Sequence, residues 1–226
     1  MKYSFLSKVV IFCSIIFVGS GCSTPKFDYS NYKQSKPRSI LILPPINESV
    51  EVAGETAVLS SLVRPVAEAG YYVMPTTLVS ETFKQNGYTQ SAKIHKLPLN
   101  KLDEIFGAYV GEIFGAYAIL YVTIKQYGQK YFVVGSSAIV ALEARLVDAK
   151  SGQEIWKGSA SANSNENNSG NSAGLVGLLV EAVVTQVIGD AFDASYPTSK
   201  IATARMLSPQ NVNALLYGPR HPKSAF

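Results

Sequence analysis

The feature that most constrains the fold is a two-residue alternation within residues 137–158. Val140, Leu142, Ala144 and Leu146 alternate there with Ala141, Glu143, Arg145 and Val147. Successive side chains of a strand point to opposite faces of a sheet, so this pattern predicts a half-buried strand. The turn-forming residues 148–152 and the segment 153–158 follow, and they predict its hairpin partner. The chain must therefore fold around a sheet that contains this hairpin.

Strand and helix patterns alternate along the rest of the chain. Helices are expected at 53–69 and 76–87, each ending at a glycine. Pro65 should kink or split the first helix, because proline lacks the N–H that a helix interior uses. Three more apolar runs predict strands, at 38–45, 71–75 and 117–128. The pattern therefore predicts an α/β protein with about five strands.

Two further segments are expected to be helical. The sequence EIFGAY occurs at 104–109 and again at 112–117, so a helix over 98–115 would present both copies on nearly the same side. Its glycines recur every fourth residue, which in lipid would suggest a helix-dimer face and in a globular domain allows close approach to a sheet. Three acidic residues favour the second interpretation, namely Asp103, Glu104 and Glu112.

The apolar segment 175–192 follows a polar stretch, 159–174, that predicts a mobile loop. A helix over 175–192 is either part of the core or buries a second face against a partner. The last thirty residues contain two short helical stretches and end in a Pro-rich tail. The candidate partner surface comprises residues of the apolar segment and of the tail: Leu175, Leu179, Val183, Tyr217 and Arg220.

The amino terminus has the layout of a secretory signal. Lys2 and Lys8 precede or flank an apolar run at 9–18, and small residues follow at 19–21. The apolar run is about half the ~20 residues that a membrane-spanning helix needs. Residues 1–21 are therefore expected to be a cleaved signal.

Cys22 stands directly after the small residues and resembles the lipobox cysteine of bacterial lipoproteins. In those proteins the cysteine sulfur receives a diacylglyceryl group, and the new amino terminus is acylated. The usual leucine three places earlier is Gly19 here, and the alternative is an ordinary signal with an incidental cysteine. Ser23, where an aspartate would signal retention, favours the outer membrane by the same resemblance.

Residues 22–37 are polar, contain prolines and lack periodicity, so they predict a flexible tether after the lipid anchor. Its r.m.s. reach would be roughly 20 Å. Residues 38–226 would then form one α/β domain facing the periplasm. Lysines and Arg38 in or beside the tether could contact anionic headgroups or serve solubility alone. Basic residues elsewhere are scattered, so no nucleic-acid surface is expected.

The search for chemistry finds one weak catalytic pattern. Residues 170–174 fit G-x-S-x-G around Ser172, and Asp190 or Asp193 and then His221 follow in hydrolase order. The segment before Ser172 lacks the apolar pattern of the buried strand that this mechanism requires. His95 has no Cys or His at metal-ligand spacing and is expected in a loop. No catalytic, metal or cofactor site is predicted.

Several blocks, in order, resemble the neisserial-antigen type of bacterial lipoprotein, a family of unknown function. They include RPVAEAGYYVMP, FKQNGYT, ARLVDAKSGQEIWKG and LLYGPRHP. Where that family is expected to have GADA, this chain has Gly115-Ala116-Tyr117-Ala118. More distantly the chain is similar to the amino-terminal domain of TolB and to CsgG-like lipoproteins. The resemblance implies a compact single domain with a mixed sheet and helices packed on it.

The resemblance also implies an adaptor or accessory role in an outer-membrane assembly or transport system, beside a CsgG-like lipoprotein and with a homodimer allowed. The resulting hypothesis is a non-enzymatic, lipid-anchored outer-membrane protein. The alternative from another class is a transport-linked lipoprotein that binds a small molecule or lipid in a tyrosine-lined pocket. A serine hydrolase is the third.

Overall fold

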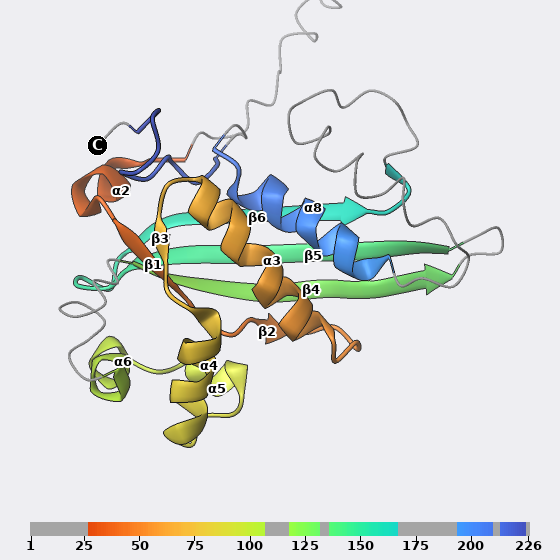
Figure 1. The fold of residues 1–226 in the computed structure, drawn as a ribbon, viewed down its shortest axis with the longest axis horizontal. Helices are drawn as coiled ribbons and strands as arrows, with labels where there is room; N and C mark the ends of the chain where they lie inside the picture. The colour runs from red at the N-terminus through yellow and green to blue at the C-terminus, as the bar shows by residue number, and fades with distance from the viewer. Residues whose placement is uncertain (1–26, 107–117, 132–135, 167–193, 210–212, 225–226) are drawn as a thin grey trace, which may run out of the picture.

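A mixed six-stranded sheet forms the centre of the computed structural model, which describes residues 27–106, 118–131, 136–166, 194–209 and 213–224 (Figure 1). The strand order is β3-β1-β4-β5-β6, and β2 pairs with the middle of β4, at Thr123 and Ile124. Pairing is parallel among β1, β2, β3 and β4 and antiparallel from β4 through β5 to β6. The strands are β1 (Ser39–Ile42), β2 (Ile46–Asn47), β3 (Tyr72–Val73), β4 (Ala118–Tyr131), β5 (Ser136–Asp148) and β6 (Glu154–Asn163).

Helices pack on both faces of this sheet. On one face α3 and α8 share an apolar core with all three long strands, and on the other α4, α5 and α6 pack against β1 and the start of β4 (Figure 1). The helices are α2 (Ser30–Ser35), α3 (Gly54–Glu68), α4 (Thr76–Gln85), α5 (Ser91–Ile94), α6 (Leu99–Phe106) and α8 (Ser195–Leu207). The predicted α/β class and mixed sheet are confirmed, and the short β2 is an additional strand.

The hairpin predicted from alternation is present as β5 and β6. Val140, Leu142 and Leu146 are almost completely buried on the face that carries α3 and α8. A bulge beside Leu146 shifts the register of β6, and Ile155 and Trp156 are both buried there. Alternation predicted the buried face correctly because it depends only on strand geometry.

The expected break at Pro65 is absent, because α3 is continuous from Gly54 to Glu68. Pro65 cannot donate to the Ser61 carbonyl, which is four residues earlier. The Thr203 hydroxyl of α8 lies 3.2 Å from that carbonyl and donates to it. A tertiary contact therefore satisfies the carbonyl that proline leaves without its helical partner.

The predicted loop 159–174 is wrong at its start, because β6 continues to Asn163. Ala160 and Ala162 pack in the α8-side core, while Ser159 and Ser161 are exposed. The small polar composition indicated a loop, but the Ser–Ala alternation has the two-residue period of a strand. Residues 167–174 lie outside the described part.

The predicted tether is also wrong over its second half, because residues 27–36 fold onto the domain. Tyr32 of α2 is fully buried, and its hydroxyl hydrogen-bonds to that of Tyr71. The Tyr29 hydroxyl donates to the Ala214 carbonyl at 2.6 Å, and Ser35 donates to Asp148 at 2.5 Å. Aromatic side chains anchor this segment, which Pro25 and Pro37 flank, because they bury large apolar areas.

Several expectations fall outside the described residues: the signal 1–21, Cys22, the second EIFGAY copy and the apolar segment 175–192. The first copy ends in α6. In place of the two short helical stretches expected near the carboxyl terminus, α8 is one helix of 13 residues. Within the described ranges, no helix has the length and apolarity needed to cross a bilayer.

Candidate functional site

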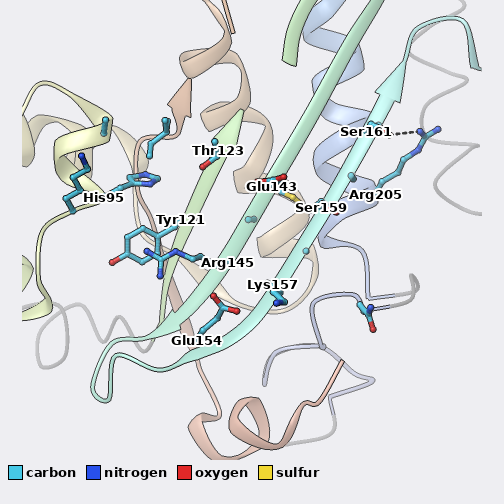
Figure 2. A pocket seen from close by; sticks show the side chains of 18 residues that line it. His95, Tyr121, Thr123, Glu143, Arg145, Glu154, Lys157, Ser159, Ser161 and Arg205 are labelled. Atoms are coloured by element: carbon cyan, nitrogen blue, oxygen red, sulfur yellow. Dashed lines mark hydrogen bonds between the residues drawn. The ribbon is translucent and has the colours of Figure 1, made fainter. Parts of the chain in front are cut away.

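A broad groove of about 1140 Å³ lies over β4, β5 and β6, on the face opposite α3 and α8, and reaches around the edge of β6 (Figure 2). It exists because α4, α5 and α6 pack near β1 and leave the far strands of this face without a helix among the described residues. We call it the sheet groove. Its polar side chains include Thr123, Glu143, Arg145, Lys157, Ser159 and Ser161.

Strand register orders these side chains into rows across the sheet. Tyr121 of β4 pairs with Arg145 of β5, which in turn pairs with Lys157 of β6. The next row on the same face is Thr123, Glu143 and Ser159. Like charges directly opposite each other in a sheet are mildly destabilising. Neither Arg145 nor Lys157 forms an ion pair with any described residue.

An aromatic stack forms one wall of the sheet groove (Figure 2). The Arg145 guanidinium carbon lies 4.1 Å from the centre of the Tyr121 ring, a cation–π geometry. The His95 ring meets Tyr121 edge-on, with 5.2 Å between ring centres. Tyr121 therefore packs against the Arg145 guanidinium, and Arg145 remains exposed at the groove.

His95 lies in the turn that follows α5, in agreement with the expected loop position, and its ring is part of this wall. Its Nε2 lies 2.9 Å from the Pro44 carbonyl oxygen, so Nε2 carries the proton that is donated. Burial lowers the pKa of His95. The Pro44 hydrogen bond raises it by less than burial lowers it, and the Arg145 charge has the smallest effect and lowers it. His95 is therefore a neutral donor at neutral pH.

The β6 edge of the groove is partly closed by α8. The Arg205 guanidinium donates to the Ser161 carbonyl at 2.9 Å and pairs with Glu166 at 2.5 Å. This contact covers one backbone acceptor of an edge strand, which would otherwise invite pairing with another chain. The exposed cations of the groove are thus Lys96, Arg145 and Lys157, facing Glu143 and Glu154.

A smaller hollow of about 470 Å³ lies beside β3 and contains part of the predicted partner surface. Arg220 is exposed and lies over the Tyr72 ring, 5.5 Å from its centre. The Tyr217 ring stacks on His221 at 3.8 Å. The structure thus places Tyr217 and Arg220 at the surface, while Leu175, Leu179 and Val183 lie outside the described residues.

The weak hydrolase pattern gains no support from His221. Its Nδ1 accepts the Lys223 N–H at 3.1 Å, whereas a triad histidine donates from Nδ1 to a carboxylate. Ser172, Asp190 and Asp193 lie outside the described residues. In the part of the chain that the structure describes, no three His, Cys, Asp or Glu side chains cluster as a metal site.

The Arg145–Lys157 row was missed at the level of sequence, although its signal was present. The alternation already placed Arg145 on the outward face of the hairpin. The five residues between β5 and β6, 149–153, together with the bulge beside Leu146, set Arg145 opposite Lys157. Turn length could have suggested this pairing, but the bulge shifts the register by one residue and is not visible in the residue pattern.

Comparison with known proteins places this chain in a class of proteins described as lipoproteins. Residues 27–220 match the family described as "Putative lipoprotein GNA1162-like", and the chain belongs to that family. A Neisseria meningitidis serogroup B protein named "Putative lipoprotein NMB1124/NMB1162" is 47% identical over 196 residues, which is 87% of this chain and 86% of that protein.

A solved structure supports the same relationship. The crystal structure of lipoprotein GNA1162 from Neisseria meningitidis is similar with a TM-score of 0.52 and 47% identity. The match covers 66% of this chain and 97% of that one. The predicted family and fold are therefore confirmed, and the names of these relatives do not state an activity.

Proposed function

We propose that this protein is a non-enzymatic lipoprotein of the outer membrane that faces the periplasm and acts as an adaptor for another envelope protein. Two features support the anchor. The family consists of proteins described as lipoproteins, and this chain carries the signal layout followed by Cys22. Acyl chains on Cys22 would hold the domain at the membrane, since each buried CH₂ contributes about 0.8 kcal/mol.

The observation that carries the binding role is the Arg145–Lys157 row in the sheet groove. Two exposed cations lie opposite each other on adjacent strands without an ion pair among the described residues. A carboxylate placed between them would relieve their repulsion and accept hydrogen bonds from both. The partner that fits is therefore a protein segment with exposed Asp or Glu side chains.

The identity of the partner is a further part of the proposal. A CsgG-like lipoprotein is the first candidate to test, because the sequence resemblance implies that the protein acts beside a lipoprotein of that type. A second copy of this chain is the other protein candidate.

A second candidate function is capture of a small carboxylate or a lipid. The same two cations would suit such a ligand, and Tyr121 provides an aromatic surface beside them. Of the tyrosines expected to line a pocket, Tyr121 lies at the sheet groove and Tyr71 and Tyr72 lie at the smaller hollow.

Crosslinking in intact cells tests the adaptor role. A photoreactive residue at Ser159, exposed inside the groove, should capture a protein, whereas one at exposed Lys84 on α4 should not. Adding Arg145→Glu and Lys157→Glu should reduce the Ser159 adduct at least tenfold. Adducts of equal yield from Ser159 and Lys84 would exclude the groove as the binding surface. A small molecule, found by mass spectrometry of the purified protein, would instead support the second candidate.

The anchor is tested separately by mass spectrometry of the mature amino terminus. The proposal requires a modified Cys22 as the first residue, and Cys22→Ser should release the protein into the soluble fraction. An unmodified amino terminus with the signal still attached would refute the anchor.

A further inference from the structure

The point at which the proposed anchor enters the folded domain is closely defined. Phe27 donates its N–H to the Asn213 side-chain oxygen at 2.8 Å and packs its ring edge-on against Tyr29 at 5.1 Å. Phe27 is five positions after Cys22 in the chain. A fully extended chain spans at most about 3.6 Å per residue, so this link reaches roughly 18 Å. This step rests on the proposed acylation of Cys22.

Detachment of the segment after Phe27 from the domain would lengthen this link, but it would break several buried contacts. The Tyr29 hydroxyl donates a hydrogen bond to the Ala214 carbonyl. Tyr32 is fully buried, and its hydroxyl hydrogen-bonds to the Tyr71 hydroxyl. The Tyr71 hydroxyl in turn lies 2.6 Å from the Leu216 carbonyl. Peeling α2 away would expose the Tyr32 ring and break contacts with the tail. The acylated residue therefore holds one particular end of the domain close to the bilayer.

That end consists of residues 27–38 and the tail 213–224, which lie together in Figure 1; we call it the anchor end. It contains one acidic residue, Asp28, which accepts the Ser30 N–H at 2.9 Å. Elsewhere in the described chain, basic and acidic residues are nearly balanced, at twelve and eleven. The anchor end has five exposed basic side chains: Lys33, Lys36, Arg38, Arg220 and Lys223.

From this placement we infer that the anchor end is a docking surface for anionic lipid headgroups. The short link brings it within contact range of the membrane, and its basic side chains complement a negative surface. The acyl chains and the basic end then act together, as membrane anchors of two different kinds commonly do. Docking of this end would also fix the orientation of the domain relative to the membrane.

The first experiment measures vesicle binding without the acyl chains, using the mature chain with Cys22→Ser. Vesicles of phosphatidylethanolamine and phosphatidylglycerol at 3:1 should bind it, and vesicles of phosphatidylcholine should not. The triple variant Lys33→Glu, Lys36→Glu, Lys223→Glu should bind at least tenfold more weakly, and added salt should have the same effect.

A matched control reverses three exposed lysines away from this end: Lys84→Glu, Lys93→Glu, Lys130→Glu. It changes the net charge equally, and its binding should fall by no more than about threefold, because surface charges beyond a Debye length are screened. Equal losses in both triple variants, or no binding of the unaltered surface to anionic vesicles, would overturn the inference. Thermal unfolding of each variant confirms that the fold is retained.

The second experiment tests orientation in the acylated protein. The chain has two cysteines, Cys13 in the signal and Cys22 at the proposed anchor, so one added cysteine is a unique thiol in the mature lipoprotein. A fluorophore at Asn31 of α2 should be quenched by headgroup-labelled lipid, and one at Gln85 of α4 should not. Equal quenching at both sites would refute a docked anchor end. An unmodified Cys22 with intact vesicle binding would instead refute only the anchor.

Discussion

Gly70 is the residue at which the carboxyl-terminal tail closes onto the domain. Its φ of 93° lies in the left-handed region, and its carbonyl accepts the Arg220 N–H at 3.2 Å. A Cβ on Gly70 would lie 2.6 Å from the His221 backbone nitrogen. Gly87 has a similar φ of 81°, but no atom lies within 4 Å of its Cβ position.

These two glycines form a matched pair for measuring the docking of the tail. Gly87→Ala should cost only the left-handed backbone conformation, about 1–2 kcal/mol of unfolding free energy. Gly70→Ala should cost a further ~1–3 kcal/mol, because its methyl group collides with the tail backbone. Urea denaturation of both variants measures the difference. Equal losses would show that the tail is not held against Gly70 in solution.

His95 should make stability depend on pH in the mildly acidic range. Its pKa is lowered in the folded protein, chiefly by burial, from an unfolded value near 6.5. As pH falls from about 6.5 through the folded pKa, the unfolded chain binds a proton that the folded protein does not. Folding should therefore lose stability over that window and recover it as pH rises.

The variant His95→Gln tests this dependence, because glutamine can still donate to Pro44 but does not titrate. Urea denaturation at pH 8 and pH 5 should show a smaller acid loss than in the parent protein. Thr123→Ser, a non-titrating change in the same groove, should keep the parental loss. An unchanged acid loss in His95→Gln would assign the effect to other groups.

At the scale of elements, hydroxyl side chains link α3 and α8 near the internal proline of α3. Ser61 Oγ lies 2.9 Å from Ser199 Oγ. Thr203 Oγ1 donates a hydrogen bond to the Ser61 carbonyl, to which Pro65 cannot donate. Thr203 Oγ1 also lies 3.1 Å from the Lys200 carbonyl, so its single proton is shared or exchanged between two acceptors. Small residues let the two helices approach closely, and this contact explains why α3 tolerates an internal proline.

A double-mutant cycle tests that explanation. Thr203→Val should lower the unfolding free energy by about 1–3 kcal/mol, because the buried Ser61 carbonyl loses its donor. In a Pro65→Ala background the restored backbone N–H can serve the same carbonyl, so the loss should be smaller by about 1 kcal/mol. Urea denaturation of the four proteins gives the coupling. Identical losses in both backgrounds would mean that Thr203 does not act through Ser61.

At the scale of the molecule, the two ends of the described chain pack together and complete the core. Phe27 and Tyr29 contact residues about 185 positions away, and Trp156 donates its indole N–H to the Asn213 carbonyl at 2.9 Å. The folded unit therefore includes the segment from Phe27 onward, whereas the sequence pattern alone would start it at residue 38.

Truncation separates these two boundaries. A chain that starts at Phe27 should unfold at the same temperature as a chain that starts at residue 22 and carries Cys22→Ser. A chain starting at Ser39 should be less stable by at least ~3 kcal/mol, since it loses the buried Tyr32 ring. That loss corresponds to about 6–12 °C in unfolding temperature. Calorimetry showing equal values for the chains starting at 27 and 39 would contradict the assigned boundary.

The sequence was sufficient to predict the structural features that depend on local geometry. Alternation at Val140, Leu142 and Leu146 predicted the hairpin and its buried face, and apolar runs predicted β1, β3 and β4, because each pattern follows from the period of one element. The signal layout and Cys22 likewise form a contiguous motif, which remains a prediction of its own.

Other features arose only when distant segments came together. The burial of Tyr32, the uninterrupted α3 at Pro65 and the row formed by Arg145 and Lys157 depend on residues far apart in the chain or on a bulge in strand register. No local period encodes such contacts, because their free energy comes from groups that meet only in the packed fold. Composition suggested a tether at 27–36, and tertiary packing made it part of the domain.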